Sequence, residues 1–255
     1  MCGRFAVTTD PALLARQIDA IDETDATDGA GAGWAGTGTN GPGAGANYNV
    51  APTDTITAVV AADGRRRLRS MRWGLVPSWS TEGPAARLLI NARAETLDTS
   101  PVFAASAHAT RCLVPMAGWY EWHRSPATGV TRNRRVGAQA VSTPYYLFAL
   151  DGRPLLMAGL WTRWRPPGGS SALASVAIIT TEAAGALAAI HDRMPVPIGA
   201  GDWDRWLDPD QGLPYALLHS DGENIGVREV SRLVNSVRNN GPELIEPARG
   251  AETLF

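Results

Sequence analysis

The feature that most constrains the fold is a set of short apolar runs that are typical of strands but do not alternate regularly with helices. Valine, isoleucine, aromatic and other apolar residues dominate these runs, which are TITAVVAA, RCLVPMAGW, PYYLFAL, LLMAGLW and LASVAIIT. Many strands without a βαβ rhythm disfavour a doubly wound parallel sheet. The sequence therefore predicts an α+β fold. We expect a twisted, largely antiparallel sheet or barrel core with short helices at its periphery.

Short helices are predicted where capping residues meet helical periodicity. Asp10-Pro11 gives an N-cap and a first helical position, and Ser100-Pro101 repeats that signal before VFAASAHA. TTEAAGALAAI has a helical composition that ends before the prolines of HDRMPVP, and DWDRWLDP is typical of a short capped helix. The apolar face expected of the first helix consists of Leu14, Ile18 and Ile21.

A low-complexity segment interrupts the chain between Asp22 and Asn47. It is rich in Gly, Ala and Thr, so it cannot bury enough apolar surface to offset the entropy of ordering. We expect a flexible surface insertion over residues 22–47. The rest of the chain, with 44% hydrophobic residues in a total of 255, is long enough to bury a core. We expect a single domain over residues 1–255.

The compartment follows from what the sequence lacks. No apolar run reaches the ~18 residues of a membrane span, and MCGRFAVTTD lacks the basic start and apolar stretch of a signal peptide. We therefore expect a cytoplasmic protein with no membrane contact. In that reducing compartment, the two cysteines, Cys2 and Cys112, are expected to be thiols.

The charge pattern argues against a strongly basic nucleic-acid-binding protein. The net charge is −2, and all 23 basic residues are arginines. Acidic residues gather in the low-complexity segment, whereas arginines cluster in RRRLRSMR, from Arg65 to Arg72. This distribution predicts at most a mildly basic face.

Cys2 is the residue with the most distinctive chemistry. Removal of Met1 is favoured by a small second residue, and it would leave an α-amine and a thiol on adjacent carbons. Both titrate near neutrality, at about 7.7–8 and about 8.5. An aldehyde would condense with the amine to an imine, and the tethered thiol would close a thiazolidine ring. The pattern indicates an aldehyde trap on a flexible, exposed end, an N-terminal-nucleophile hydrolase, or a chance cysteine at a frayed terminus.

Several further motifs follow Cys2 along the chain. They are NYNVAPT, MRWGLVPSW, NARAET, LVPMAGWYEW, AGLW, ITTEA, HDRMP and VNSVRNNGPELIEP. Together with MCGRF, they resemble the SRAP family, the SOS response-associated peptidase domain. The glycine-rich segment departs from the family's pattern but touches no motif. The resemblance implies an SRAP-like domain that senses abasic sites in single-stranded DNA during the DNA damage response. It also implies a covalent thiazolidine crosslink through Cys2.

The resemblance assigns catalytic roles to four residues. Cys2 supplies both nucleophiles. Glu121, which lies between two aromatic residues and is therefore expected to be partly buried, would have a raised pKa and act as a proton donor and relay. His191 would help to open the sugar ring, and Asn91 would orient the α-amine or bond the sugar.

Five residues are expected to bind DNA. Arg4 and Arg93 would hold phosphates next to the lesion, and Trp73 would stack on a neighbouring base. Asn49 and Pro52 would line the cleft. Cys112 lies within an apolar run and is expected to be an inert core thiol.

Two alternatives to crosslinking remain open. A cysteine peptidase or autoprotease would use the same Cys2 but would need an oxyanion hole and a peptide groove. A plain single-stranded-DNA-binding module would bind without forming an adduct. A lyase activity is also compatible with the family. No histidine or cysteine spacing is typical of a zinc site, so no metal or cofactor is expected. We expect a monomer that is associated with the nucleoid when bound to DNA.

Overall fold

The computed structural model describes residues 2–25, 45–85, 87–125, 141–169 and 171–248. Most of the expected flexible insertion, residues 26–44, lies outside these ranges, so its flexibility stays a prediction.

Five strands close a ring at the centre of the fold. They are β4 (Thr55–Ala62), β5 (Arg65–Trp73), β7 (Arg111–Met116), β10 (Leu155–Trp164) and β11 (Leu173–Glu182). Antiparallel pairing runs in the order β11-β10-β7-β4-β5. A parallel pairing of β5 with β11, in which Arg72 lies opposite Ser175, completes the ring. Short strands extend it: β12 (Arg193–Pro195) and β6 (Asn91–Arg93) pair with β11, and β2 (Ala20–Asp22) pairs with β5.

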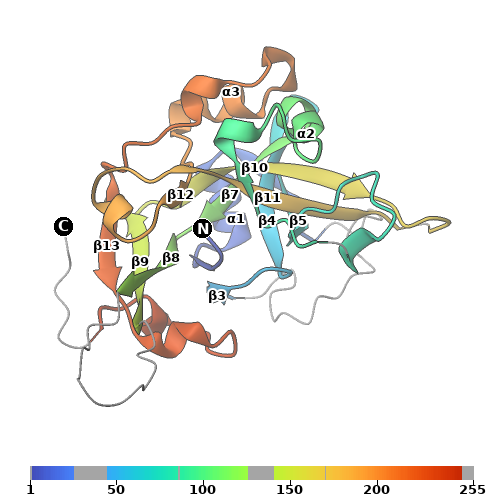
Figure 1. Ribbon diagram of the computed structural model, residues 1–255. Helices are drawn as coiled ribbons and strands as arrows, with labels where there is room; N and C mark the ends of the chain where they lie inside the picture. Colours follow the sequence, from blue (N-terminus) through green and yellow to red (C-terminus); the bar gives the residue numbers. More distant parts are fainter. Residues whose placement is uncertain (1, 26–44, 86, 126–140, 170, 249–255) are drawn as a thin grey trace.

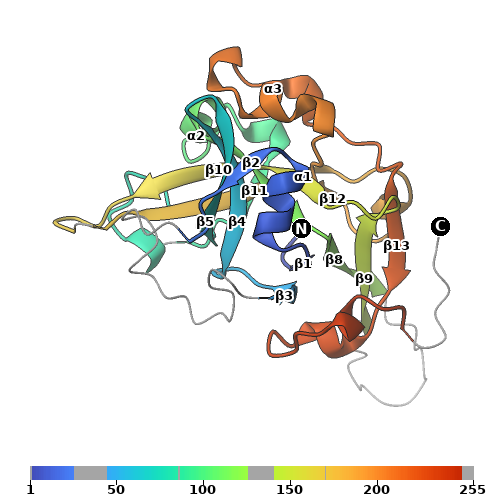
Figure 2. The same ribbon diagram turned by 180° about the vertical axis from the view of Figure 1, so that it is seen from behind.

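A second, fully antiparallel sheet lies beside the ring, on the left in Figure 1 and on the right in Figure 2. Its strand order is β13-β9-β8-β1-β3. The strands are β13 (Ile225–Glu229), β9 (Val141–Ala149), β8 (Gly118–Ser125), β1 (Phe5–Val7) and β3 (Asn47–Val50). The two sheets confirm the predicted α+β fold with a largely antiparallel core.

Helices within the described ranges are few and short. They are α1 (Pro11–Gln17), α2 (Ala104–Ala109) and α3 (Trp203–Leu207). The 3₁₀ turns are η1 (Gly83–Ala85), η2 (Ala94–Thr96), η3 (Gly185–Ala189), η4 (Ala200–Asp202), η5 (Pro209–Gln211), η6 (Tyr215–Leu217), η7 (Arg232–Asn235) and η8 (Pro242–Leu244). No helix within the described ranges is long and apolar enough to cross a membrane.

Three of the four predicted helices are present. DWDRWLDP contains α3, although no side chain caps it. The first helix ends at Gln17, so Ile21, which was expected on its apolar face, lies in β2 instead.

The Asp10 carboxylate caps α1 by accepting hydrogen bonds from the amides of Ala12 and Leu13. The second helix begins only at Ala104, and no side chain caps it, so the start predicted at Ser100-Pro101 is wrong. In TTEAAGALAAI the first three residues end strand β11, and only the turn η3 follows.

The ring strands bury both of their faces, as their near-continuous apolar sequences require. One face, which includes Val59 and Leu113, packs in a cluster with apolar side chains of α1, α2 and α3. The other face, which includes Val60 and Val114, packs in a cluster with Cys2 and with the second sheet. The N-terminal residues are thus held between the ring and the second sheet.

Candidate functional site

Cys2 lies inside the fold. Strand β1, which begins at Phe5, pairs with β8 on one side and β3 on the other, and the Phe5 ring packs edge-on against Trp73 at 4.9 Å. These contacts fix the chain just before β1, and the Cys2 side chain is 0% exposed. The expectation of a flexible, exposed end is therefore wrong, because strand pairing begins within three residues of the cysteine.

Asn91 holds the backbone of Cys2. Its position is set by β6, which runs parallel to β11 with Asn91 opposite Ile178. The Nδ2 atom donates a hydrogen bond to the Cys2 carbonyl oxygen at 2.8 Å. The Oδ1 atom is buried, and no donor among the described residues reaches it. A buried acceptor without a partner is costly, so Asn91 has an acceptor to offer to an N–H group at this end of the chain.

Glu121 lies on β8 and is 3% exposed, as its aromatic neighbours predicted. Burial raises its pKa from 4.5 to about 7. The carboxyl group is thus able both to donate and to accept a proton near neutral pH. Burial, and then the charge of Glu121, raise the pKa of the Cys2 thiol. The thiol is therefore protonated at neutral pH and needs a base to become a strong nucleophile.

His191 faces Glu121 from the loop that precedes β12. Its Nε2 atom is 3.9 Å from a Glu121 carboxylate oxygen, and its Nδ1 atom accepts the Arg193 backbone N–H at 3.0 Å. The exposed Asp192 carboxylate also lies 2.8 Å from Nδ1. An amide can only donate and a carboxylate can only accept, so these two contacts exclude each other. The fixed amide and the burial that lowers the pKa of His191 both favour a neutral ring with its proton on Nε2.

A pocket of about 470 Å³ opens onto these proton carriers. Its lining consists of Glu121, Trp122, His123, Arg124, Ile190 and His191. The volume is in the range of small-molecule sites. Arg124, which the sequence interpretation missed, brings an exposed cation to this pocket. In the described ranges, no group of three or more His, Cys, Asp or Glu side chains is arranged to hold a metal ion.

Arg4, two residues after Cys2, forms a hydrogen-bonded unit with Asn49. Arg4 Nη1 donates to Asn49 Oδ1 at 2.7 Å and to the Val234 carbonyl at 3.0 Å. Asn49 Nδ2 in turn donates to the carbonyls of Ser236 and Asn239. Asn49 is 3% exposed. Through these hydrogen bonds its side chain links the loop over residues 234–239 to Arg4. Direct contact of Asn49 with DNA remains a prediction.

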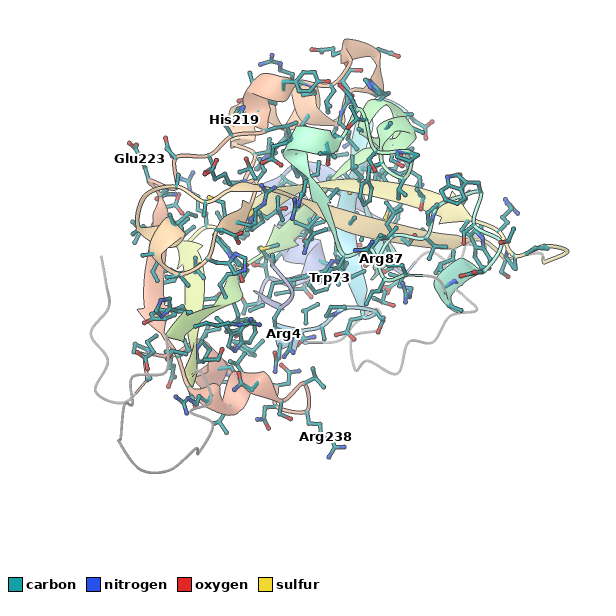
Figure 3. All side chains as sticks on the ribbon, in the orientation of Figure 1. Arg4, Trp73, Arg87, His219, Glu223 and Arg238 are labelled. Atoms are coloured by element: carbon teal, nitrogen blue, oxygen red, sulfur yellow. The ribbon has the colours of Figure 1, made fainter. Side chains whose placement is uncertain are left out.

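The other expected DNA-binding residues differ in exposure. Trp73 is fully buried, and its Nε1–H donates to the Ile90 carbonyl at 3.1 Å. Its ring has no free face in this structure, so stacking on a base would first require the ring to be uncovered, and it remains a prediction. Pro52 is half-buried in the turn between β3 and β4, and Arg93 is exposed at the end of β6. In the view of Figure 3, Arg4 and Trp73 lie near the middle of the molecule in projection, and Arg238 lies farther out.

Arg193 is a site residue that the sequence interpretation missed. Its guanidinium makes bidentate hydrogen bonds to the Glu95 carboxylate, at 2.7 and 3.0 Å. It also donates to the Thr180 carbonyl at 2.6 Å. These bonds tie the HDRMP loop to the NARAET segment and so fix the amide that binds His191. Arg193 in HDRMP and Glu95 in NARAET have opposite charges, and this was the sequence signal that could have indicated their ion pair.

The arginine cluster of β5 does not form a free basic face. Arg66 binds the Asp204 carboxylate at 2.8 Å, and Arg69 binds Glu23 at 3.1 Å. Arg67 binds Glu23 and Asp63. Acidic partners thus neutralise most of the cluster, which is compatible with at most a mildly basic face.

Comparisons with known proteins bear on the family and the fold of the chain. The model of one protein family, SOS response associated peptidase (SRAP), matches residues 1–237. The abasic site processing protein YoqW of Bacillus subtilis is 36% identical over 205 residues, which cover 78% of this chain and 85% of the relative. The abasic site processing protein HMCES of Xenopus tropicalis is 31% identical over 231 residues, which cover 77% of this chain and 64% of the relative. A crystal structure of a Bacteroides thetaiotaomicron protein has the same fold, with a TM-score of 0.76 at 21% identity over 97% of this chain and all of the other.

Proposed function

Because the chain belongs to the SRAP family, we propose that it processes abasic sites in DNA, the activity for which its curated relatives are named. The proposed product is a covalent thiazolidine crosslink between Cys2 and the aldehyde of an abasic site in single-stranded DNA. The crosslink would shield the lesion during the SOS response. The protein would act as a monomer in the cytoplasm, at the nucleoid when bound to DNA.

The observation that carries this proposal is the surroundings of Cys2. The Cys2 carbonyl is held by Asn91, and the charge of Glu121 acts directly on the Cys2 thiol. His191 Nε2 lies 3.9 Å from the same Glu121 carboxylate. Removal of Met1 would leave an amine and a thiol on Cys2 near groups that can move protons. This supports the proposal, because trapping a masked aldehyde requires proton transfer.

The chemistry proceeds in three steps. First, protonated Glu121, or the protonated fraction of His191, donates a proton to the ring oxygen while the anomeric hydroxyl loses its proton to water, and the sugar ring opens to its aldehyde. Second, the α-amine of Cys2, freed by removal of Met1, attacks the aldehyde carbon, and loss of one water gives an imine. Third, the thiol sulfur attacks the imine carbon while its proton moves, through Glu121, to the imine nitrogen. The product has new C–N and C–S bonds, and no electrons are gained or lost.

Orientation of the amine is the role we assign to Asn91. Its Nδ2 is engaged by the Cys2 carbonyl, whereas its buried Oδ1 has no donor among the described residues. An amine hydrogen accepted by Oδ1 would leave the nitrogen lone pair directed away from Asn91. The arginines Arg4, Arg93 and Arg124 would bind phosphates on either side of the lesion.

The test is an adduct assay on a denaturing gel. The mature protein is incubated with a labelled single-stranded oligonucleotide that contains one abasic site, and with the same oligonucleotide carrying a normal base. We expect a slowly migrating band that needs the abasic site and survives denaturation. Mass spectrometry should show the added mass of the DNA minus water on Cys2. Absence of a band, or an adduct at another residue, would overturn the proposal.

The same experiment separates the other activities. A peptidase would release fragments from a peptide substrate in a reaction that needs Cys2 but no DNA. A lyase would shorten the oligonucleotide at the abasic site. The raised pKa of the Cys2 thiol favours crosslinking, because a protonated thiol attacks a peptide carbonyl poorly, whereas the amine can react first with an aldehyde.

A further inference from the structure

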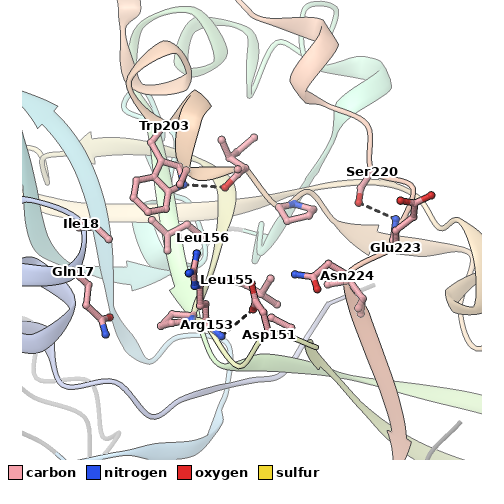
Figure 4. Close-up of a pocket in the computed structure, with 18 of the residues that line it drawn as sticks. Gln17, Ile18, Asp151, Arg153, Leu155, Leu156, Trp203, Ser220, Glu223 and Asn224 are labelled. Carbon is pink, nitrogen blue, oxygen red and sulfur yellow. Dashed lines mark hydrogen bonds between the residues drawn. The ribbon is translucent and has the colours of Figure 1, made fainter. Parts of the chain in front are cut away.

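A second pocket, separate from the candidate site, lies against the start of strand β10 of the ring. It has a volume of about 620 Å³ and shares no lining residue with the pocket at Glu121 and His191. Its walls come from α1, the β9–β10 turn, the segment between β12 and α3, and the loop over residues 220–225 (Figure 4). Segments far apart in sequence therefore converge on this pocket. Its volume is large enough for a ligand the size of several amino-acid side chains.

The floor of this pocket is apolar. Leu155, Leu156 and Ile198 are 9%, 3% and 5% exposed, and they present aliphatic carbon to the cavity. Trp203 lies above Leu156 in Figure 4, held by a hydrogen bond from its Nε1 to the Ile198 carbonyl at 2.9 Å. A large apolar side chain would be desolvated on this floor, which favours binding.

The rim of the pocket is polar and mainly acidic. Asp151, Asp221 and Glu223 are exposed carboxylates, and Arg153 is the single cation among the lining residues. Asp151 and Asp221 each accept a backbone amide of their own turn, at 3.0 and 3.1 Å, so their positions are fixed while their charge remains. The rim would attract cations and repel the phosphates of DNA or of a lipid surface.

Hydrogen-bonding groups stand between the floor and the rim. Gln17 and Asn224 bring exposed side-chain amides, and Arg153 brings a guanidinium. Such donors and acceptors suit the peptide backbone, which carries one of each at nearly every residue.

We propose that this pocket binds a short segment of a partner protein in which a large apolar side chain is followed by basic residues. The apolar side chain would rest on Leu155, Leu156 and Ile198, and the basic residues would face Asp221 and Glu223. Because the pocket shares no residue with the candidate site, a partner bound there could bring the protein to its DNA without blocking Cys2.

Gly199 is a position in the pocket lining where a bulky side chain can be added without a clash at its Cβ. It lines the pocket, and a Cβ at this position would meet no atom within 4 Å. Gly201, two residues on, is equally open but does not line the pocket. Gly199→Phe is therefore the blocking variant, and Gly201→Phe is its matched control.

The binding test uses three fluorescein-labelled peptides with the central sequences Phe-Arg-Arg, Ala-Arg-Arg and Phe-Glu-Glu. Fluorescence polarisation with the full chain should show binding of Phe-Arg-Arg, and about tenfold weaker binding or none for the other two. Gly199→Phe should weaken Phe-Arg-Arg binding about tenfold or more, whereas Gly201→Phe should not change it. The double change Asp221→Asn and Glu223→Gln should weaken Phe-Arg-Arg binding and increase its tolerance of salt.

Three results would overturn the proposal. They are no binding of Phe-Arg-Arg at millimolar concentration, equal binding of all three peptides, and Phe-Arg-Arg binding that Gly199→Phe leaves intact. The Trp203 indole N–H signal in an NMR titration locates the bound peptide, because this group lines the pocket. Adduct formation with abasic DNA should be the same in both glycine variants, so failure of the crosslinking proposal would not be mistaken for failure of this one.

Discussion

Cys2 and Cys112 lie in the same apolar cluster, both are fully buried, and burial raises the pKa of both thiols. Their neighbours differ. Cys2 has Asn91 on its carbonyl and the charge of Glu121 acting on its thiol. Cys112 lies within β7, opposite Gly159 of β10, where a Cβ in place of the glycine hydrogen would come within 2.9 Å of its sulfur.

Exposure therefore does not separate the cysteine that we propose to be functional from the other cysteine. Neither thiol is ionised or accessible in the resting structure, so neither is activated in the usual sense. The distinction lies in position along the chain and in nearby proton carriers. Only Cys2 can have a free amine beside its thiol, and of the two thiols only that of Cys2 is influenced by a carboxyl group.

The largest effect that would follow from this difference is complete loss of the adduct in Cys2→Ala. The substitution keeps a terminal amine after Met1 removal but removes the sulfur that closes the ring. Cys2→Ser is the matched control, and it should give at most a hydrolysable imine. The measurement is the yield of denaturation-resistant adduct with single-stranded abasic DNA. A durable adduct from Cys2→Ala would erase the distinction between the two cysteines.

The next largest effect is expected for Glu121→Gln. Loss of this acid and base should slow adduct formation by about 10²–10⁴-fold. Release of a preformed adduct should slow as well, because the same proton transfers operate in reverse. His191→Gln is the comparison, and it should slow formation much more than release. A time course followed by a chase with unlabelled abasic DNA measures both rates, and wild-type rates in Glu121→Gln would make Glu121 structural.

A smaller effect concerns stability as a function of pH. The pKa of Glu121 is raised from 4.5 to about 7, so the unfolded state loses this proton first as pH rises. The free energy of unfolding of the wild type should therefore fall as the pH rises from 4.5 to about 7, by up to about 3 kcal/mol. Glu121→Gln should remove that fall and be more stable than wild type at pH 8. Urea unfolding at pH 5 and pH 8 measures the difference, and equal pH dependence in both proteins would contradict the burial of a neutral carboxyl group.

The smallest effect is predicted for Cys112→Ala. Loss of a buried sulfur from a packed strand should lower the free energy of unfolding by about 1 kcal/mol. Adduct yield and rate should match wild type, because Cys112 has neither an amine nor a proton carrier beside it. Chemical denaturation and the gel assay check the two statements together. A loss of adduct at unchanged stability would show that the core thiol takes part in the chemistry.

Strands were predicted better than helices because long-range pairing decides this fold. TITAVVAA coincides with β4, since its apolar residues suit a strand that is buried on both faces. TTEAAGALAAI looked helical from its composition. However, Thr180 and Thr181 pair with β12, and this pairing overrides the local preference. No local signal in the sequence reports that partner.

The residue types and local burial in the candidate site were easier to predict than its long-range geometry. The identity of Cys2 and the partial burial of Glu121 follow from the residues themselves and from their immediate neighbours. The burial of Cys2 does not, because it depends on β1 pairing with β8 and β3. Asn49 anchors the loop over residues 234–239 through hydrogen bonds to carbonyls that lie 187 and 190 residues farther along the chain, so this role could not be predicted from nearby sequence.

The bond between Arg4 and the Val234 carbonyl joins residues separated by 230 positions. During synthesis the N-terminal segment leaves the ribosome first, long before the loop that binds Arg4 has been made. Asn91, Glu121 and His191 are also added later. A nascent chain therefore exposes its N-terminal cysteine before the proton carriers and the Arg4 contact are in place. Only the completed fold buries Cys2 and places its carbonyl on Asn91, so the same long-range bonds that assemble the candidate site also end the exposure of this thiol.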